Sequence, residues 1–270
     1  MTATSPYARV ERPRLLQRAN PLAVAAAVAP GIVVAFTAPG PATPCALLVL
    51  ATLAVAAGVR VPTRHRVLVF AGPVLFTLFA SLTLGLWTPA DDVAGTPLLL
   101  AAGPFEYRLG TWLAGLAISL RLGAVLALAL VPGVASTGPD VVRAAVQNLR
   151  VPYRIGYTAL ASFRFVPRFS RELAQIRAAH RVRGTARGRG PLAAIRRGTG
   201  YLVPLLAGAL RHAERVALAM DARAFGAHPA RTERILLPFR GGDIVLVAVT
   251  WALIAAALWL PLSVPDVRPA

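Results

Sequence analysis

The sequence predicts an all-α integral membrane protein with about five transmembrane helices and further amphipathic helices on the cytoplasmic side. Of its 270 residues, 56% are hydrophobic and only 15% are charged, whereas a soluble domain has about a quarter of its residues charged. The formal net charge is nevertheless +18, and because the sequence contains no lysine, all 29 basic residues are arginine. High hydropathy and high charge are compatible only if they are segregated along the chain, which is the pattern observed.

Five apolar segments are candidates for transmembrane helices, which need about 17 to 25 mostly apolar residues, and the first two of them are short. They comprise residues 21–37, 44–59, 67–87, 111–131 and 243–262. Pro30 and Gly58 leave the limits of the first two open. Residues 93–104 are apolar but short and rich in glycine and proline, which predicts a surface or re-entrant segment. The single cysteine, Cys45, excludes a disulfide framework and a cysteine-rich metal site, and is interpreted as a small apolar residue of a membrane helix.

The distribution of arginine predicts the orientation of these helices, because cytoplasmic loops carry an excess of arginine and lysine. One side of the predicted membrane holds 26 arginines and the other holds two. The N-terminus and residues 132–242 are therefore predicted to be cytoplasmic, and the C-terminal tail to lie outside. The predicted regions are a basic tail (1–20), a four-helix membrane region (21–131), a cytoplasmic region (132–242) and a last span with its outer tail (243–270).

Arg121 lies inside the fourth predicted span. A charged residue within a membrane is costly and is a candidate for a functional role. The structural alternative is an ion pair, or a hydrogen bond to backbone carbonyls of a neighbouring span. The sequence favours the structural interpretation.

The cytoplasmic region contains three predicted amphipathic helices with arginines outside the apolar face. The first starts at Thr137 and is interrupted by Pro152, the second runs from Pro167 to Gly184, and the third from Pro191 towards Gly226. Residues 153–166 are apolar but too short to span a membrane. Residues 185–190 predict a turn-rich connector, and Pro204 predicts a kink in the third helix.

Two of these helices end on an arginine near a glycine, at Arg183-Gly184 and at Arg223-Ala-Phe-Gly226. The local interpretation is that the cation offsets the helix dipole and the glycine forms a left-handed cap. Two such endings, expected on the same face of one cytoplasmic insertion, favour a second interpretation. Each would present a planar guanidinium with five donors to the carboxylates and carbonyls of a partner protein.

From residue 140 to residue 225 the chain resembles the transmembrane (T) component of energy-coupling factor transporters, which import vitamins and metal ions into prokaryotic cells. The matching segments are DVVRAAVQNLRVP, FRFVPRFSRELAQIRAAHRVRG and AMDARAFG. The resemblance implies a multi-pass protein of the plasma membrane. It also implies coupling helices that end in Ala-Arg-Gly-type motifs and dock onto two ATP-binding-cassette ATPases. The same helices would hold a separate substrate-binding (S) membrane subunit.

Carried over by position, the resemblance makes these the ATPase-docking residues: Val182, Arg183 and Gly184 in the first motif, and Ala222, Arg223 and Ala224 in the second. Val182 replaces an alanine of the motif, and Ala224 replaces a glycine. A subunit of this kind is non-catalytic and holds no cofactor. The sequence agrees, because a chain without lysine cannot contain the lysine of a phosphate-binding loop.

Two other functions remain open at this stage. A membrane enzyme that acts on a phosphorylated or lipid substrate would need acidic groups near the basic helices. The candidates are Glu172, Glu214 and Asp221, although the first and last are expected to pair with arginines of their own helices. Nucleic-acid binding by the arginines is disfavoured because the apolar stripe of the same helices is expected at the membrane surface. The four histidines are scattered, and no metal site is expected.

Overall fold

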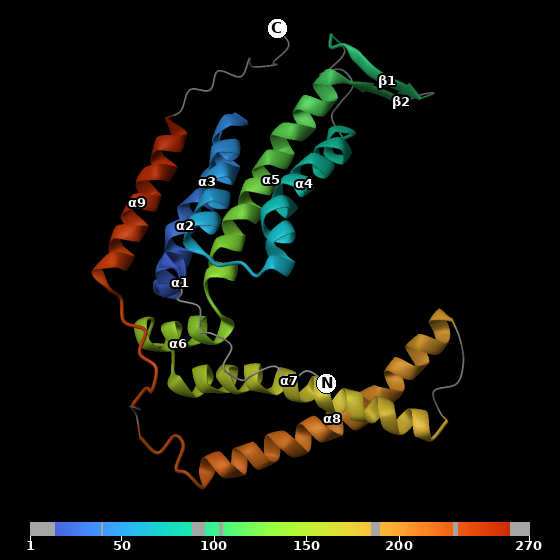
Figure 1. The fold of residues 1–270 in the computed structure, drawn as a ribbon, viewed down its shortest axis with the longest axis vertical. Coiled ribbons are helices and arrows are strands. Elements are labelled where there is room, and N and C mark those ends of the chain that lie inside the picture. Colours follow the sequence, from blue (N-terminus) through green and yellow to red (C-terminus); the bar gives the residue numbers. More distant parts are fainter. Residues whose placement is uncertain are drawn as a thin grey trace. The chain divides into compact units, whose positions relative to one another are not determined.

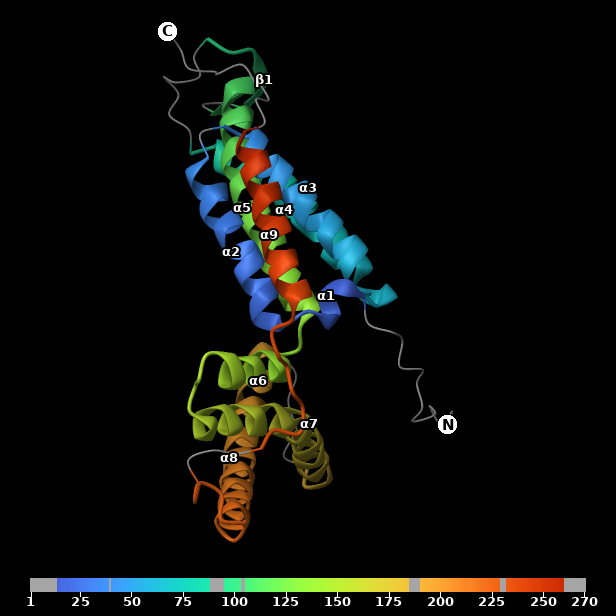
Figure 2. The same ribbon diagram turned by 90° about the vertical axis from the view of Figure 1, so that its left-hand side faces the viewer.

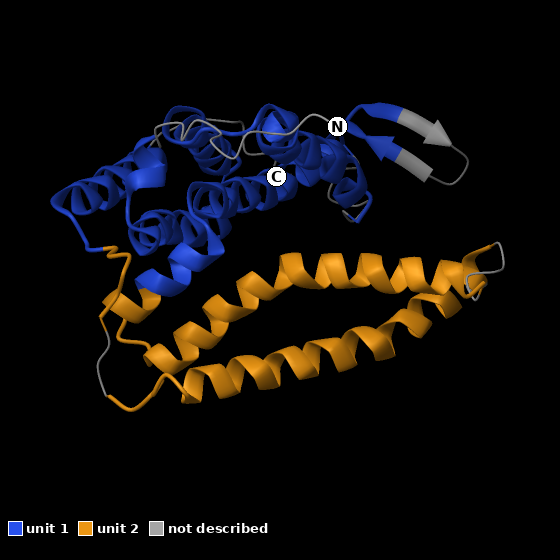
Figure 3. Ribbon diagram, turned by 60° about the horizontal axis from the view of Figure 1, so that its bottom comes forward, with its two compact units in different colours: residues 1–144, 238–270 blue, residues 145–237 orange. Residues whose placement is uncertain are grey.

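The computed structural model describes residues 14–38, 40–87, 95–102, 105–184, 190–228 and 232–259. The described chain is mainly helical, as predicted (Figure 1). It divides into two compact units (Figure 3): unit 1 contains residues 1–144 and 238–270, and unit 2 contains residues 145–237.

Unit 1 contains the five predicted spans, and all five are helical. Its elements are α1 (Leu15–Arg18), α2 (Pro21–Thr37), α3 (Ala42–Gly58), α4 (Thr63–Gly85), β1 (Leu98–Ala102), β2 (Phe105–Arg108), α5 (Leu109–Ala135) and α9 (Gly241–Leu258). Helix α2 has the predicted limits and continues through Pro30. Residues 260–262 of the last predicted span and residues 1–13 of the basic tail lie outside the described residues.

Three helices of the described chain, α4, α5 and α9, are long and apolar enough to cross a membrane. Helices α2 and α3 are apolar but have 17 residues each, so each is about 25 Å long at 1.5 Å per residue. Large apolar side chains on α4, among them Leu75, Phe79 and Leu82, are exposed in the isolated chain. Exposed apolar side chains along a helix of spanning length are expected of a surface that faces lipid.

Helix α5 lies at the centre of the unit 1 bundle (Figure 2). Its buried side chains Ala124 and Leu128 belong to one apolar cluster with α2, α3 and α9. Leu47 of α3 and Ile254 of α9 contribute to the same cluster. The periodicity of apolar residues does not predict which helix is central, because all five helices are apolar around most of their circumference.

Helices α4 and α5 pack closely because small residues line their contact. Ser81 and Gly85 on α4 face Gly115 on α5. A Cβ atom added at Gly115 would lie 2.5 Å from the amide nitrogen of Gly85 and closer still to the carbonyl oxygen of Ser81. Small residues allow helix backbones to approach closely in membrane proteins, where packing rather than water exclusion drives association. Gly115 is therefore a packing position.

One buried carboxylate connects the starts of α2 and α9. Asp243 is 4% exposed, and its side chain accepts hydrogen bonds from the backbone N–H groups of Asn20 (2.9 Å) and Arg240 (2.8 Å). The Asn20 side chain in turn caps α2 by accepting from the Leu22 N–H at 3.0 Å. An acidic group at a helix N-terminus also opposes the positive end of the helix dipole. Asp243 thus fixes two helix starts that are far apart in sequence.

A β-hairpin lies where the sequence predicted only a surface or re-entrant segment. Strand β1 pairs with β2 in antiparallel register, with Leu98 opposite Arg108 and Ala102 opposite Phe105. Residues 93, 94, 103 and 104 of the predicted segment lie outside the described residues. The strands were not predicted because their glycine- and proline-rich surroundings are typical of irregular loops.

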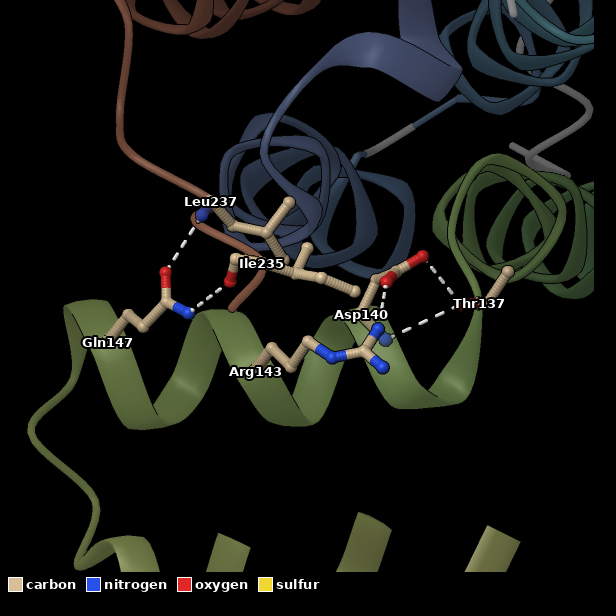
Figure 4. A network of polar contacts seen from close by, with 6 residues as sticks. All are labelled: Thr137, Asp140, Arg143, Gln147, Ile235 and Leu237. Carbon is tan, nitrogen blue, oxygen red and sulfur yellow. Dashed lines mark hydrogen bonds and ion pairs between the residues drawn. The ribbon is translucent and has the colours of Figure 1, made fainter. Parts of the chain in front are cut away.

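Helix α6 (Gly138–Asn148) starts in unit 1 and ends in unit 2. The predicted start at Thr137 is confirmed, and Thr137 caps the helix, since the Asp140 N–H donates to the Thr137 hydroxyl oxygen at 3.4 Å (Figure 4). Asp140 also pairs with Arg143 at 2.7 Å. At its end, within unit 2, the Gln147 amide donates to the Ile235 carbonyl and accepts from the Leu237 N–H, both at 2.8 Å (Figure 4).

The rest of unit 2 is formed by α7 (Tyr153–Val182) and α8 (Pro191–Asp221). The interruption at Pro152 is confirmed, but the prediction that a new helix begins at Pro167 is wrong. Helix α7 continues through Pro167 even though proline removes one backbone hydrogen bond. The reason is tertiary: Phe165 before the proline and Glu172 after it both contact α8.

Candidate functional site

Helices α7 and α8 form an antiparallel pair that carries both arginine endings (Figure 3). Aromatic contacts join the first half of each helix to the second half of the other, or to the residues that directly follow it. The ring centroids of Tyr157 and Phe225 are 5.0 Å apart, and Phe225 lies just after the end of α8. The ring centroids of His180 and Tyr201 are 5.1 Å apart. Helix α7 has 30 residues, which corresponds to a length of about 45 Å.

The first ending has the backbone of a left-handed helix cap. The Arg183 N–H donates to the Ala179 carbonyl at 3.0 Å, which completes the last helical turn. Gly184 follows with φ +67°, and its N–H donates to the Arg181 carbonyl at 3.1 Å. This bond from the left-handed residue to a carbonyl three residues earlier is one of the two that define a Schellman cap.

The second ending repeats this geometry with alanine at the left-handed position. Ala224 has φ +52°, and its N–H donates to the Asp221 carbonyl at 2.9 Å. The Phe225 N–H donates to the Met220 carbonyl at 3.0 Å, which is the other defining bond of the cap. Arg183 and Arg223 therefore occupy the same position, directly before the left-handed residue.

Both guanidinium groups are available to a partner. Arg183 and Arg223 are exposed, and neither side chain has a hydrogen bond or ion pair among the described residues. Antiparallel packing places the two endings at opposite ends of the helix pair. From the rise per residue they are about 40 Å apart along the pair. Val182 is 90% exposed, and Ala222 is also exposed.

The left-handed position provides a matched pair of test substitutions. We expect Ala224→Gly to stabilise its helix end and Gly184→Ala to destabilise its own, each by about 1 kcal/mol, because only glycine adopts positive φ without steric cost. Amide hydrogen exchange in the last turn of each helix measures both effects. Equal exchange rates in Ala224→Gly and the unaltered chain would contradict the assigned backbone geometry.

Sequence reasoning missed the aromatic residues that pack against the second ending. Phe225 contacts Tyr157 and also Tyr153, with ring centroids 5.8 Å apart in the second case. Both tyrosines lie in the first turns of α7. The only signal in the sequence was the aromatic character of residues 153, 157 and 225, which does not identify partners more than 60 positions apart.

The acidic residues that a membrane enzyme would require do not come together. Glu172 lies in the middle of the helix pair, against Gly208 of α8, whereas Glu214 and Asp221 are exposed. The expected pairing of Glu172 and Asp221 with arginines of their own helices is not found among the described residues. Nor does any group of three or more His, Cys, Asp or Glu side chains there lie close enough to hold a metal ion.

His212 lies near Glu172, and its surroundings lower the pKa of its ring. Its ring packs edge-on against Phe165, with centroids 5.0 Å apart. Desolvation lowers the pKa of His212, the charges of Arg168 and Arg215 lower it further, and the charge of Glu172 opposes them. A lowered pKa favours the uncharged ring, which suits this aromatic contact between the two helices.

Arg121 makes the kind of contact that the structural interpretation predicts. Its Nη2 donates to the carbonyl of Ala38, at the C-terminus of α2, at 3.1 Å. Its Nε is buried and has no partner among the described residues. A cation at a helix C-terminus offsets the negative end of the dipole, so Arg121 connects α5 to α2.

Comparisons with known proteins place these features in a family. The family model described as CbiQ, cobalt transport protein, matches residues 13–233. The energy-coupling factor transporter transmembrane protein EcfT of Bacillus subtilis is 28% identical over 222 residues, covering 79% of this chain and 82% of that protein. EcfT of Leuconostoc gelidum is 27% identical over 184 residues, covering 65% of each.

A third relative is much longer than this chain. A protein of Bifidobacterium longum that is named as an ABC transporter ATP-binding protein is 30% identical over 230 residues, which is 81% of this chain. The chain spans only 28% of that protein's length.

Proposed function

Because the chain belongs to the CbiQ family of cobalt transport proteins and is a transmembrane component of an energy-coupling factor transporter, we propose that it couples two ATPases to substrate import. Arg183 and Arg223 dock onto the two ATPase subunits, and the α7–α8 pair transmits their motion. The observation that carries this proposal is that both arginines are exposed, unpaired within the described residues and held in the same backbone geometry.

The separation of the arginines supports two docking sites rather than one. Endings about 40 Å apart along an antiparallel pair are too distant for a single groove on one partner. Each guanidinium offers five N–H donors and suits carboxylate and carbonyl acceptors. The relative from Bifidobacterium longum, which is named for ATP binding, supports a functional relation between this kind of segment and an ATPase.

The same proposal fixes the orientation in the membrane. ATPases that use cellular ATP lie in the cytoplasm, so the arginine endings and the arginine-rich N-terminus are on that side. Trp87 and Trp259, which follow the C-terminal ends of α4 and α9, are strongly exposed. Tryptophan is enriched at membrane interfaces, and these two residues suit the outer interface.

The substrate enters through a separate membrane subunit that rests on α8. Leu202, Leu206 and Leu210 are exposed at helical spacing along this helix, and an amphipathic face of this kind suits an apolar partner surface. The chain itself is a transporter component and performs no reaction. The imported substrate is a vitamin or a metal ion.

The composition of the native complex tests the proposal. We expect the full chain, purified through an affinity tag from its own membranes, to retain ATP-binding-cassette subunits at about two per chain, measured by quantitative mass spectrometry. Vesicles that contain this complex should accumulate substrate only when ATP is present on the ATPase side. Purification of the chain without any ATPase, or turnover of a phosphorylated substrate by the chain alone, would contradict it.

A further inference from the structure

The turn that follows α8 is fastened to the start of α7 by two hydrogen bonds. Arg154 donates from Nη2 to the carbonyl oxygen of Gly226 at 2.7 Å. The Tyr153 hydroxyl donates to the carbonyl oxygen of His228 at 2.8 Å. A hydrogen bond from a charged donor is stronger than one between neutral groups. The backbone on the C-terminal side of Arg223 is therefore held at two points.

The guanidinium of Arg154 also fills the space beside Gly226. Gly226 has φ +93°, and a Cβ atom added there would lie 3.1 to 3.3 Å from three guanidinium atoms of Arg154. Together with the packing of Phe225 on Tyr153 and Tyr157, these contacts form a clamp, defined here as Tyr153, Arg154 and Tyr157. Arg223 lies between the last turn of α8 and the residues that the clamp holds, while its own side chain stays exposed.

The clamp has a physical reason at this ending. Ala224 adopts a left-handed conformation that an L-residue with a Cβ atom disfavours. A residue in such a conformation persists when the surrounding structure fixes it. Gly184, at the other ending, needs no such support to reach its positive φ.

We propose that Arg154 and Tyr153 are positioning residues for Arg223, which keep the turn 222–228 in the shape that docks onto an ATPase. This inference rests on the proposed function of Arg223. It adds that residues at the start of α7 control the docking of the end of α8. A force on Arg223 is consequently transmitted to the start of α7, and the opposite end of α7 carries Arg183.

Binding measurements with single and double variants test the inference. The full chain in nanodiscs is titrated with the ATPase subunits identified in its native complex. We expect Arg223→Ala and Arg154→Ala each to weaken binding about tenfold, the loss expected for one charged hydrogen bond. The double variant should bind about as weakly as Arg223→Ala alone, because Arg154 acts only through Arg223. Arg164→Ala, which removes another exposed arginine of α7, should bind like the unaltered chain.

Two readouts separate positioning from general unfolding. Hydrogen exchange at the amides of Phe225 and Ala227 should become faster in Arg154→Ala, and also in Tyr153→Phe, which retains the ring that contacts Phe225. Exchange within α8 from residue 205 to residue 215 should not change. Faster exchange throughout α8 would overturn the inference.

The binding outcomes also separate this inference from the proposed function. If Arg223→Ala weakens binding but Arg154→Ala does not, or if their effects multiply to about a hundredfold, the positioning role is wrong and docking through Arg223 stands. If Arg223→Ala itself leaves binding unchanged, the proposed function is wrong.

Discussion

Replacement of both Arg183 and Arg223 with alanine is expected to abolish substrate uptake and to release the ATPases during purification. Each substitution removes a charge and five N–H donors that have no partner among the described residues. Hydrogen bonds to charged groups contribute about 1.5–3 kcal/mol each. Loss of at least one at each ending corresponds to about 3–6 kcal/mol, or a factor of about 10² to 10⁴ in affinity.

Uptake of labelled substrate by cells and retention of the ATPases on the tagged chain measure this prediction. The control is the double variant Arg164→Ala, Arg211→Ala, which removes one exposed arginine from each helix of the same pair. Both double variants lower the net charge by two, but the control leaves the endings intact. Equal losses in the two variants would mean that overall charge, rather than the endings, attracts the ATPases. Full uptake by Arg183→Ala, Arg223→Ala would contradict the docking role.

Conversion of the two arginines to lysine should restore only part of the function. Lysine keeps the positive charge but lacks the planar fork of donors that matches a carboxylate. Uptake by the lysine variant that is lower than in the unaltered chain but higher than in the alanine variant would therefore show that docking requires the geometry of the guanidinium group as well as its charge.

The sequence was sufficient to predict the endings because they are local. An arginine followed by glycine at the end of an amphipathic pattern indicates both the end of α7 and its left-handed cap. The cap at Ala224 could not be predicted in the same way, because alanine disfavours positive φ and only long-range contacts compensate. The clamp on the following turn involves residues more than 60 positions apart, which no local pattern connects.

The continuity of α7 through Pro167 also depends on tertiary contacts that the local sequence does not reveal. Pro167 alone favours a helix start, and the sequence prediction followed that local preference. Contacts of Phe165 and Glu172 with α8 hold the two sides of the proline in one helix. Likewise, the limits of α2 followed from its apolar composition. The central position of α5 depends on which helices pair, and this could not be derived from composition.

Substitution of Gly115 by alanine is expected to cause the largest loss of stability of any glycine-to-alanine change among the described glycines of unit 1. The new Cβ atom would meet backbone atoms of Ser81 and Gly85, and backbone cannot move aside as a flexible side chain can. Helices α4 and α5 would have to separate, which loses packing along their contact. Overpacking of this kind costs about 1–3 kcal/mol and occasionally more.

Gly133→Ala is the matched control for this prediction, because Gly133 lies in the same helix and a Cβ atom added there meets nothing within 4 Å. The same chemical change should be neutral or slightly stabilising at Gly133, since alanine favours helix more than glycine does. Thermal unfolding in detergent, followed by the loss of monodisperse protein, compares the two variants directly. Because helix propensity affects both sites alike, only the close approach of α4 can make Gly115→Ala less stable than Gly133→Ala. Identical unfolding temperatures for the two variants would therefore show that the α4–α5 contact is looser than described.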